Sequence, residues 1–148
     1  MKTEKKQYVV FRLADEEYGA DIIKVTVIER MMYITRVPKT PEYIKGVINL
    51  RGDIIPVMDL RARLGLTEKE EDDETRIIIF DINNVSFGAI VDSVSEVLQL
   101  EETKVESTAG IIKDKTKDFI YGVAKAESKL FTLLNLEKLI SDLVPEMS

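Results

Sequence analysis

Hydrophobic residues in this chain gather in short runs that are bounded by Gly, Asn, Asp and Pro. Runs of this length, rich in β-branched residues, predict strands, and a helical period is missing from most of them. No strand–helix alternation is present, which favours small antiparallel barrels. The runs are YVVFRL (8–13), IIKVTVIE (22–29), GVINL (46–50), DIIPVMDL (53–60), RIIIFDI (76–82), SFGAIVD (86–92), SEVLQL (95–100), FIYGVAKA (119–126) and SKLFTLL (128–134).

The second half of the chain repeats the first. An offset of 69 residues relates Phe11 to Phe80, and an offset of 76 relates GVINLRGDIIPVMDLRARL from Gly46 to GVAKAESKLFTLLNLEKLI from Gly122. A single duplication predicts an approximate twofold, with a seam between the halves. Each copy has only about 60 residues, a size that is marginal alone, so the copies should pack on each other. We therefore expect Phe11 and Phe80 to occupy equivalent buried positions.

Short helices should close the two copies. Asp59 and Asn135 stand at equivalent N-cap positions, and Gly65 stands where the first helix should end. We expect one domain over 1–148, with a first barrel copy at 7–66, a solvated acidic linker at 67–75 and a second barrel copy at 76–144. The second copy has seven extra residues, which we expect to form a polar loop within 107–118.

Composition excludes several classes of function. The net charge of −6 and the pI of about 4.9 argue against a nucleic-acid partner, which demands a basic face. The chain has no Cys and no His, which removes disulfides, the usual zinc sites and the commonest general base. No apolar run approaches the roughly 18 residues of a membrane span, and the charged start lacks the apolar core of a signal peptide. We expect a cytoplasmic protein without a cofactor and without direct membrane insertion.

The two copies differ most sharply at one hairpin connection. Copy one has INLRGD (48–53) where copy two has AKAESK (124–129), although the flanking apolar pattern is retained. The need for a turn does not explain this difference, so the segment is the first place to look for function. Arg51 could hold a carboxylate or a phosphate through its planar guanidinium. No GxxxxGK[ST] or GxGxxG motif accompanies it, so nucleotide binding is unsupported.

Three segments carry a family signature. They are DEEYGADIIKV (15–25), KTPEYIKGVINLRGDIIPVMDLRARLG (39–65) and VSFGAIVDSVSEVL (85–98). On these segments the chain resembles the CheW family of chemotaxis coupling proteins, from about Tyr8 to about Leu143. The order GVINLRG, IIPV and DLR is specific to that family.

The resemblance implies a non-enzymatic adaptor made of two five-stranded SH3-like barrels around a shared core. Such a protein connects the cytoplasmic tip of methyl-accepting chemoreceptors to the regulatory domain of the histidine kinase CheA. It is expected to be a monomer when free and to be recruited to receptor arrays at the membrane. The receptor's helical hairpin would lie in the groove between the barrels, as an amphipathic helix lies in an apolar groove.

The resemblance also assigns residues. The expected receptor-binding residues are Ile22, Val25, Ile28, Gly46, Asn49, Arg51, Val94 and Val97. The expected kinase-binding residues are Val37, Pro38 and Arg51. Val27 stands where the family often has an acidic residue, so a charged contact is not expected there.

Three other interpretations stay open at this point. The chain could be a paralogue that serves another chemosensory-like array, a stand-alone peptide-binding barrel, or a small carboxylate-dependent hydrolase built on Asp53 and Asp59. A hydrolase should gather these carboxylates and Arg51 around one cavity. An adaptor should instead show an open apolar groove between the two copies.

Overall fold

The structure is a computed structural model that describes residues 5–101, 105–106, 119–126 and 129–141. The expected polar loop within 107–118 lies outside these residues. So do Glu127 in the second copy's hairpin connection and the chain after Ser141.

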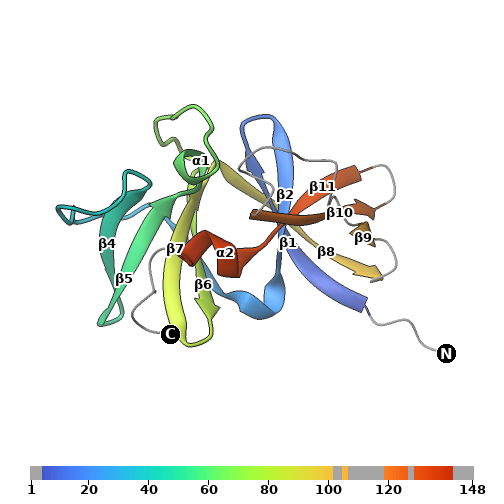
Figure 1. Ribbon diagram of the computed structural model, residues 1–148, viewed down its shortest axis with the longest axis horizontal. Coiled ribbons are helices and arrows are strands. Elements are labelled where there is room, and N and C mark those ends of the chain that lie inside the picture. Colours follow the sequence, from blue (N-terminus) through green and yellow to red (C-terminus); the bar gives the residue numbers. More distant parts are fainter. Residues whose placement is uncertain (1–4, 102–104, 107–118, 127–128, 142–148) are drawn as a thin grey trace.

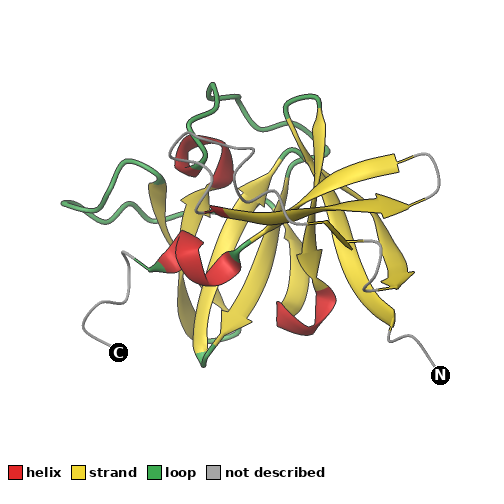
Figure 2. Ribbon diagram, turned by 45° about the vertical axis from the view of Figure 1, so that its right-hand side comes forward, coloured by secondary structure: helices red, strands yellow, loops and turns green. Residues whose placement is uncertain are grey.

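Strands make up most of the described chain, and the helices are short (Figure 2). A 3-10 helix, η1 (Ile22–Lys24), joins two strands, while α1 (Leu60–Arg63) and α2 (Leu136–Ile140) each follow a strand. The strands are β1 (Lys5–Leu13), β2 (Glu16–Asp21), β3 (Val25–Arg30), β4 (Ile44–Leu50), β5 (Asp53–Asp59), β6 (Arg76–Ile82), β7 (Val85–Val91), β8 (Ser93–Glu101), β9 (Val105–Glu106), β10 (Ile120–Ala126) and β11 (Lys129–Leu134).

The strands form two sheets with the same internal order, which lie on either side of α2 in Figure 1. One sheet runs β3-β6-β7-β5-β4, and the other runs β8-β1-β2-β11-β10 and is extended by the two-residue β9. Under the sequence repeat β3 matches β8, β6 matches β1, β7 matches β2, β5 matches β11 and β4 matches β10. The all-β fold class with two five-stranded units is thus confirmed.

Each sheet combines strands from both copies, so the division at 7–66 and 76–144 does not follow the sheets, and the crossing of the first strand, which the sequence left open, is observed. The β1–β2 hairpin of copy one lies between β8 and β11 of copy two, and the β6–β7 hairpin of copy two lies between β3 and β5 of copy one. The hairpins are held there by parallel pairing of β2 with β11 and of β7 with β5. The ranges 7–66 and 76–144 therefore describe the sequence repeat and not the composition of the two sheets.

The core also repeats. Alternate residues of β1 and β6 face opposite sides, because successive side chains of a strand alternate. Phe11 and Phe80 are both buried in one cluster shared by the two sheets, as expected, and each stacks on an equivalent ring, Tyr18 or Phe87. The residues on the opposite faces of β1 and β6 point into two further clusters, one in each sheet. These cores hold Tyr8, Val10, Ala124, Phe131 and Leu133 in one sheet and the equivalent Ile77, Ile79, Ile48, Ile55 and Val57 in the other.

Two glycines permit the parallel pairing. A Cβ on Gly19 would lie 2.6 Å from the Phe131 ring, and one on Gly88 would lie 2.9 Å from Ile77 Cγ2. Real Cβ atoms do not approach this closely, so both positions require the absence of a side chain. The glycines are equivalent in the repeat and lie opposite Leu133 and Val57 in the parallel pairs.

The helix caps agree with the sequence. Asp59 Oδ1 accepts from Arg61 N at 3.0 Å, and Asn135 Oδ1 accepts from Lys138 N at 3.3 Å. Gly65 follows α1 with a φ of 77°, and its N–H donates to Ala62 O, which is the glycine-ended termination expected. Asp59 is therefore a capping residue at the start of α1.

Candidate functional site

The candidate site is formed by two edge strands, β3 and β8, which are equivalent in the repeat. Val25 lies opposite Phe80 in the β3–β6 pair, and Val94 lies opposite Phe11 in the β8–β1 pair. Both valines are half-buried and pack against the shared core. The two sheets thus present the same apolar residue next to the same buried ring.

Three residues further along each strand, past a shift in the pairing register that keeps the same face, an apolar side chain reaches solvent. Ile28 of β3 is 37% exposed and Val97 of β8 is 48% exposed, and the two are again separated by the offset of 69. Ile22 in η1 is half-buried against the shared core, while its neighbour Ile23 is 82% exposed. The expected receptor residues of β3, η1 and β8 therefore divide into supporting residues, Ile22, Val25 and Val94, and accessible ones, Ile28 and Val97.

Asp92, directly before β8, is an ionic junction that sequence reasoning missed. Its Oδ1 accepts from Arg61 Nε at 2.8 Å and its Oδ2 accepts from Arg61 Nη2 at 2.5 Å. The same Oδ2 accepts from the backbone N–H of Ala14 at 2.8 Å, in the β1–β2 turn. Arg61 Nη1 also donates to Thr67 O at 2.8 Å, at the start of the linker. One carboxylate thus joins α1, the β1–β2 turn and the start of β8.

The electrostatics of this junction favour the ionised carboxylate. Burial alone would raise the pKa of Asp92, but the hydrogen bonds from Arg61 and from Ala14 N–H outweigh burial and hold that pKa below its ordinary value. The hydrogen bond from Arg61 to Asp92 likewise raises the pKa of the guanidinium. The pair remains charged at neutral pH.

A second ion pair lies at the equivalent place in the other copy, with reversed charges. Glu137 of α2 binds Lys24 of η1, directly before β3. Burial would raise the pKa of Glu137, but the hydrogen bond from Lys24 lowers it. The sequence carried a signal for these pairs, because the offset of 76 relates Arg61 to Glu137, a residue of the opposite charge.

The β4–β5 turn carries Arg51 on strained backbone. Arg51 has a φ of 54° and Gly52 a φ of 94°, and Asn49 Oδ1 accepts from Gly52 N at 3.0 Å. A non-glycine residue in the left-handed region is disfavoured, so the guanidinium is kept there at some cost to stability. Ile54, 64% exposed, follows the turn. Asn49 supports the turn, while Arg51 is exposed at its tip.

Gly46 has a structural role. It is buried in β4 with a φ of 149°, and a Cβ there would lie 2.1 Å from Thr35 O. Thr35 pairs with Val47 through two backbone hydrogen bonds, so the chain before β4 crosses directly over the glycine. This position admits the close approach of two backbones, and the side chains around it carry any contact with a partner.

Val37 and Pro38 lie in the loop that precedes β4. Val37 is 38% exposed, and its carbonyl accepts from Thr40 Oγ1 at 3.0 Å. Both residues line an open hollow of about 370 Å³. The expected kinase-binding residues of this loop are therefore accessible, on a different element from β3 and β8.

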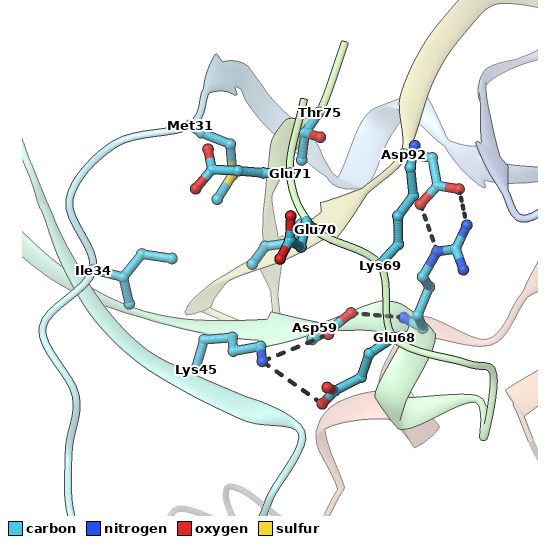
Figure 3. A pocket seen from close by; sticks show the side chains of 12 residues that line it. Met31, Ile34, Lys45, Asp59, Glu68, Lys69, Glu70, Glu71, Thr75 and Asp92 are labelled. Atoms are coloured by element: carbon cyan, nitrogen blue, oxygen red, sulfur yellow. Dashed lines mark hydrogen bonds and ion pairs between the residues drawn. The ribbon is translucent and has the colours of Figure 1, made fainter. Parts of the chain in front are cut away.

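The carboxylates of the hydrolase alternative do not converge. Asp53 and Asp59 are the first and last residues of β5, and a strand rises about 3.4 Å per residue, so they are separated by roughly 20 Å. A cavity of about 550 Å³ is lined by Asp59 but not by Asp53 or Arg51. There Lys45 Nζ lies 3.9 Å from Asp59 Oδ2 and 4.0 Å from Glu68 Oε1 (Figure 3). The concavity required of a hydrolase is absent from the described residues.

Among the residues with described positions, no group of three or more Asp or Glu could hold a metal ion. No helix within the described ranges is long and apolar enough to cross a membrane.

Comparison with known proteins assigns the family. The family model of the CheW-like domain matches residues 7–144. The chain belongs to the CheW family. Chemotaxis protein CheW of Bacillus subtilis is 39% identical over 135 residues, which cover 91% of this chain and 86% of that protein. Chemotaxis protein CheW of Klebsiella aerogenes is 33% identical over 140 residues, which cover 95% of this chain and 84% of that protein.

A solved structure supports the same assignment. The crystal structure of the scaffolding protein TtCheW from Thermoanaerobacter tengcongensis matches with a TM-score of 0.86 and 40% identity, and the match covers 93% of each chain. The CheW family consists of non-enzymatic chemotaxis scaffolds, so the hydrolase interpretation is wrong. The residues that bind partners remain predictions, which the geometry of β3, β8 and the β4–β5 turn supports to different degrees.

Proposed function

We propose that this protein couples the cytoplasmic hairpin tip of methyl-accepting chemoreceptors to the regulatory domain of the histidine kinase CheA. It does so in the cytoplasm, as a monomer when free, and joins membrane receptor arrays through its partners. The observation that carries the proposal is the pair of equivalent accessible residues, Ile28 and Val97, on edge strands of two barrels that share a core.

The receptor site is assigned to the groove between β3 and β8. A receptor hairpin presents helices, and an amphipathic helix binds through apolar side chains spaced along one face. Val25 and Val94 would form the floor of the groove, since they are half-buried, and Ile28 and Val97 its accessible walls. Removal of exposed apolar area from water supplies the affinity.

The kinase site is assigned to Arg51 and to the loop of Val37 and Pro38. Both lie outside β3 and β8, so the residues proposed for the kinase are on other elements than the groove residues. Arg51 is suited to recognition, because a guanidinium at the tip of a turn can bind a carboxylate bidentately. In the sequence, an acidic residue replaces it in the second copy, so the two hairpin connections differ in charge.

Binding to a purified receptor hairpin fragment tests the proposal. Val97→Asp should weaken binding at least about tenfold, since a charge placed in an apolar contact loses its hydration. Leu130→Asp is the matched control, because Leu130 is also exposed, at 64%, but lies on β11. Equal loss of affinity in the two variants, or none in Val97→Asp, would contradict the assignment of the groove.

A further inference from the structure

The chain crosses between the two sheets at two places, and an ion pair holds each crossing. The first crossing, from β2 to β3, passes through η1, and the second, from β7 to β8, passes through Asp92. Lys24 of η1 binds Glu137, and Asp92 binds Arg61. We name these two ion pairs the crossover pairs.

The crossover pairs are related by the repeat but carry opposite charges. Arg61 and Glu137 are separated by the offset of 76 and stand at the same position of α1 and α2. Lys24 and Ser93, the neighbour of Asp92, are separated by the offset of 69. In each half, the helix that closes one sheet thus binds the segment by which the chain leaves that sheet.

One residue of each crossover pair lies directly before an edge strand, β3 or β8. Lys24 directly precedes Val25, the first residue of β3, and Asp92 directly precedes Ser93, the first residue of β8. Within the described residues, β3 pairs with β6 alone and β8 pairs with β1 alone, because each is the edge strand of its sheet. The start of each edge strand is therefore fixed by its crossing as well as by its single neighbouring strand.

We propose that the two crossover pairs are positioning devices that hold β3 and β8 at a fixed spacing, and so set the width of the groove for a receptor helix. This inference rests on the proposed function for its consequence in binding. Its geometric part, that the pairs fix the spacing of the two strands, stands on the ion pairs alone.

The two pairs are unequal in strength. The Arg61 and Asp92 side chains are only 13% and 14% exposed and are joined by two parallel hydrogen bonds. The Lys24 and Glu137 side chains are 35% and 48% exposed. Bidentate, partly buried pairs are geometrically specific, whereas exposed pairs are weak and screened by salt. The pair at β8 is the stronger constraint, and the wall formed by β3 is the more adjustable one.

A distance measurement tests the geometric part directly. Thr26 of β3 and Ser95 of β8 are both exposed and equivalent in the repeat, and the chain contains no Cys. Spin labels on Thr26→Cys and Ser95→Cys should give a narrow distance distribution by pulsed electron paramagnetic resonance. Asp92→Asn should broaden it clearly and Glu137→Gln slightly.

The linker supplies the matched control. Lys69 Nζ and Asp72 Oδ2 form an exposed ion pair at 2.9 Å, so Asp72→Asn removes the same charge away from the crossings. The control should leave the distance distribution unchanged. An unchanged distribution in Asp92→Asn, or equal broadening in Asp72→Asn, would overturn the inference.

Binding of the receptor hairpin fragment tests the consequence. Asp92→Asn should lower the affinity about fivefold and Glu137→Gln about twofold or less, while affinity for the CheA regulatory domain stays unchanged. Broadened distances with unchanged hairpin affinity would overturn the link to the groove. A wild-type protein that fails to bind the fragment would contradict the proposed function, while the spin-label distances would still decide the geometric part.

Discussion

The two sheets of this protein agree in their interiors and differ at their surfaces. Inside, Phe11 and Phe80 stack on equivalent rings, and the separate sheet cores hold equivalent residues. At the surface, one half has the ion pair of Arg61 and Asp92, and the other half has the ion pair of Glu137 and Lys24. Arg51 has no arginine counterpart in AKAESK. Packing thus keeps the same positions apolar in both copies, while the charges at the surface differ. We expect Arg51, in the part that differs, to serve partner recognition, and the equivalent residues Ile28 and Val97 to serve receptor binding.

The largest expected effect on stability tests whether the two interiors are equivalent. Phe11→Ala and Phe80→Ala should each lower the free energy of unfolding by about 3–5 kcal/mol, because each removes a fully buried ring and leaves a cavity. Urea denaturation should show losses that agree within about 1 kcal/mol. Leu130→Ala, at an exposed position, should change stability little. A large difference between the two Phe variants would contradict the shared, symmetric core.

The crossover pairs should differ in their contribution to stability. Asp92→Asn should cost about 1.5–3 kcal/mol, since it weakens hydrogen bonds to a charged, partly buried group. Glu137→Gln, at an exposed pair, should cost less than about 1 kcal/mol. Chemical denaturation of the two variants measures this directly. Equal costs would remove the basis for calling the pair at β8 the stronger one.

The pH dependence of stability sharpens the same contrast. The pKa of Asp92 is lower in the folded chain than in the unfolded chain. Its stabilisation is therefore fully present above the unfolded carboxyl pKa of about 3.9 and is lost as the pH falls through the folded value. Unfolding midpoints from pH 7 down to pH 2 should fall less steeply below about pH 4 in Asp92→Asn than in the wild type. Identical profiles would contradict the role of this carboxylate.

A smaller effect on stability is expected at the β4–β5 turn, which differs between the two copies. Arg51→Gly should raise the free energy of unfolding by about 1 kcal/mol, because glycine adopts a φ near 54° without the strain of a side chain. The same variant should weaken binding of the CheA regulatory domain, measured by titration calorimetry. Arg36→Gly is a control for the stability measurement only, since Arg36 is also an exposed arginine and its φ is not positive, but it lines the same hollow as Val37 and Pro38. Loss of stability in Arg51→Gly would mean that the side chain serves the fold and not recognition.

Sequence reasoning predicted the local features of the fold. Most of the strands, the caps at Asp59 and Asn135, and the equivalence of Phe11 and Phe80 follow from patterns within or between short segments. The strand β2 (Glu16–Asp21) was not predicted, because it lies outside the apolar runs. The exchange of hairpins between sheets did not follow, because it depends on parallel pairing of β2 with β11, which are far apart in the chain. Hydrophobic alternation fixes the face of a strand but not its neighbours.

The residues of the candidate site stay predictions. The family resemblance assigned Val25 and Val94 to one groove, and the structure shows both half-buried against the core. Their partial burial makes them poor probes of binding, because a charge at Val94 would disturb packing as well as recognition. Burial could not be read from the repeat, since core and groove positions of an edge strand are both apolar. Ile28 and Val97, the accessible duplicates, are the better probes.

Kinase activity in a reconstituted mixture of receptor and CheA tests the central claim most directly. Addition of the wild-type protein should raise phosphorylation of CheA, and Arg51→Glu, which makes the turn acidic as in the second copy, should reduce that activation at least about tenfold while keeping the fold. Circular dichroism of the variant checks the fold. Equal kinase activity with the wild type, with Arg51→Glu and with no added protein would contradict the account of this chain as the coupling element.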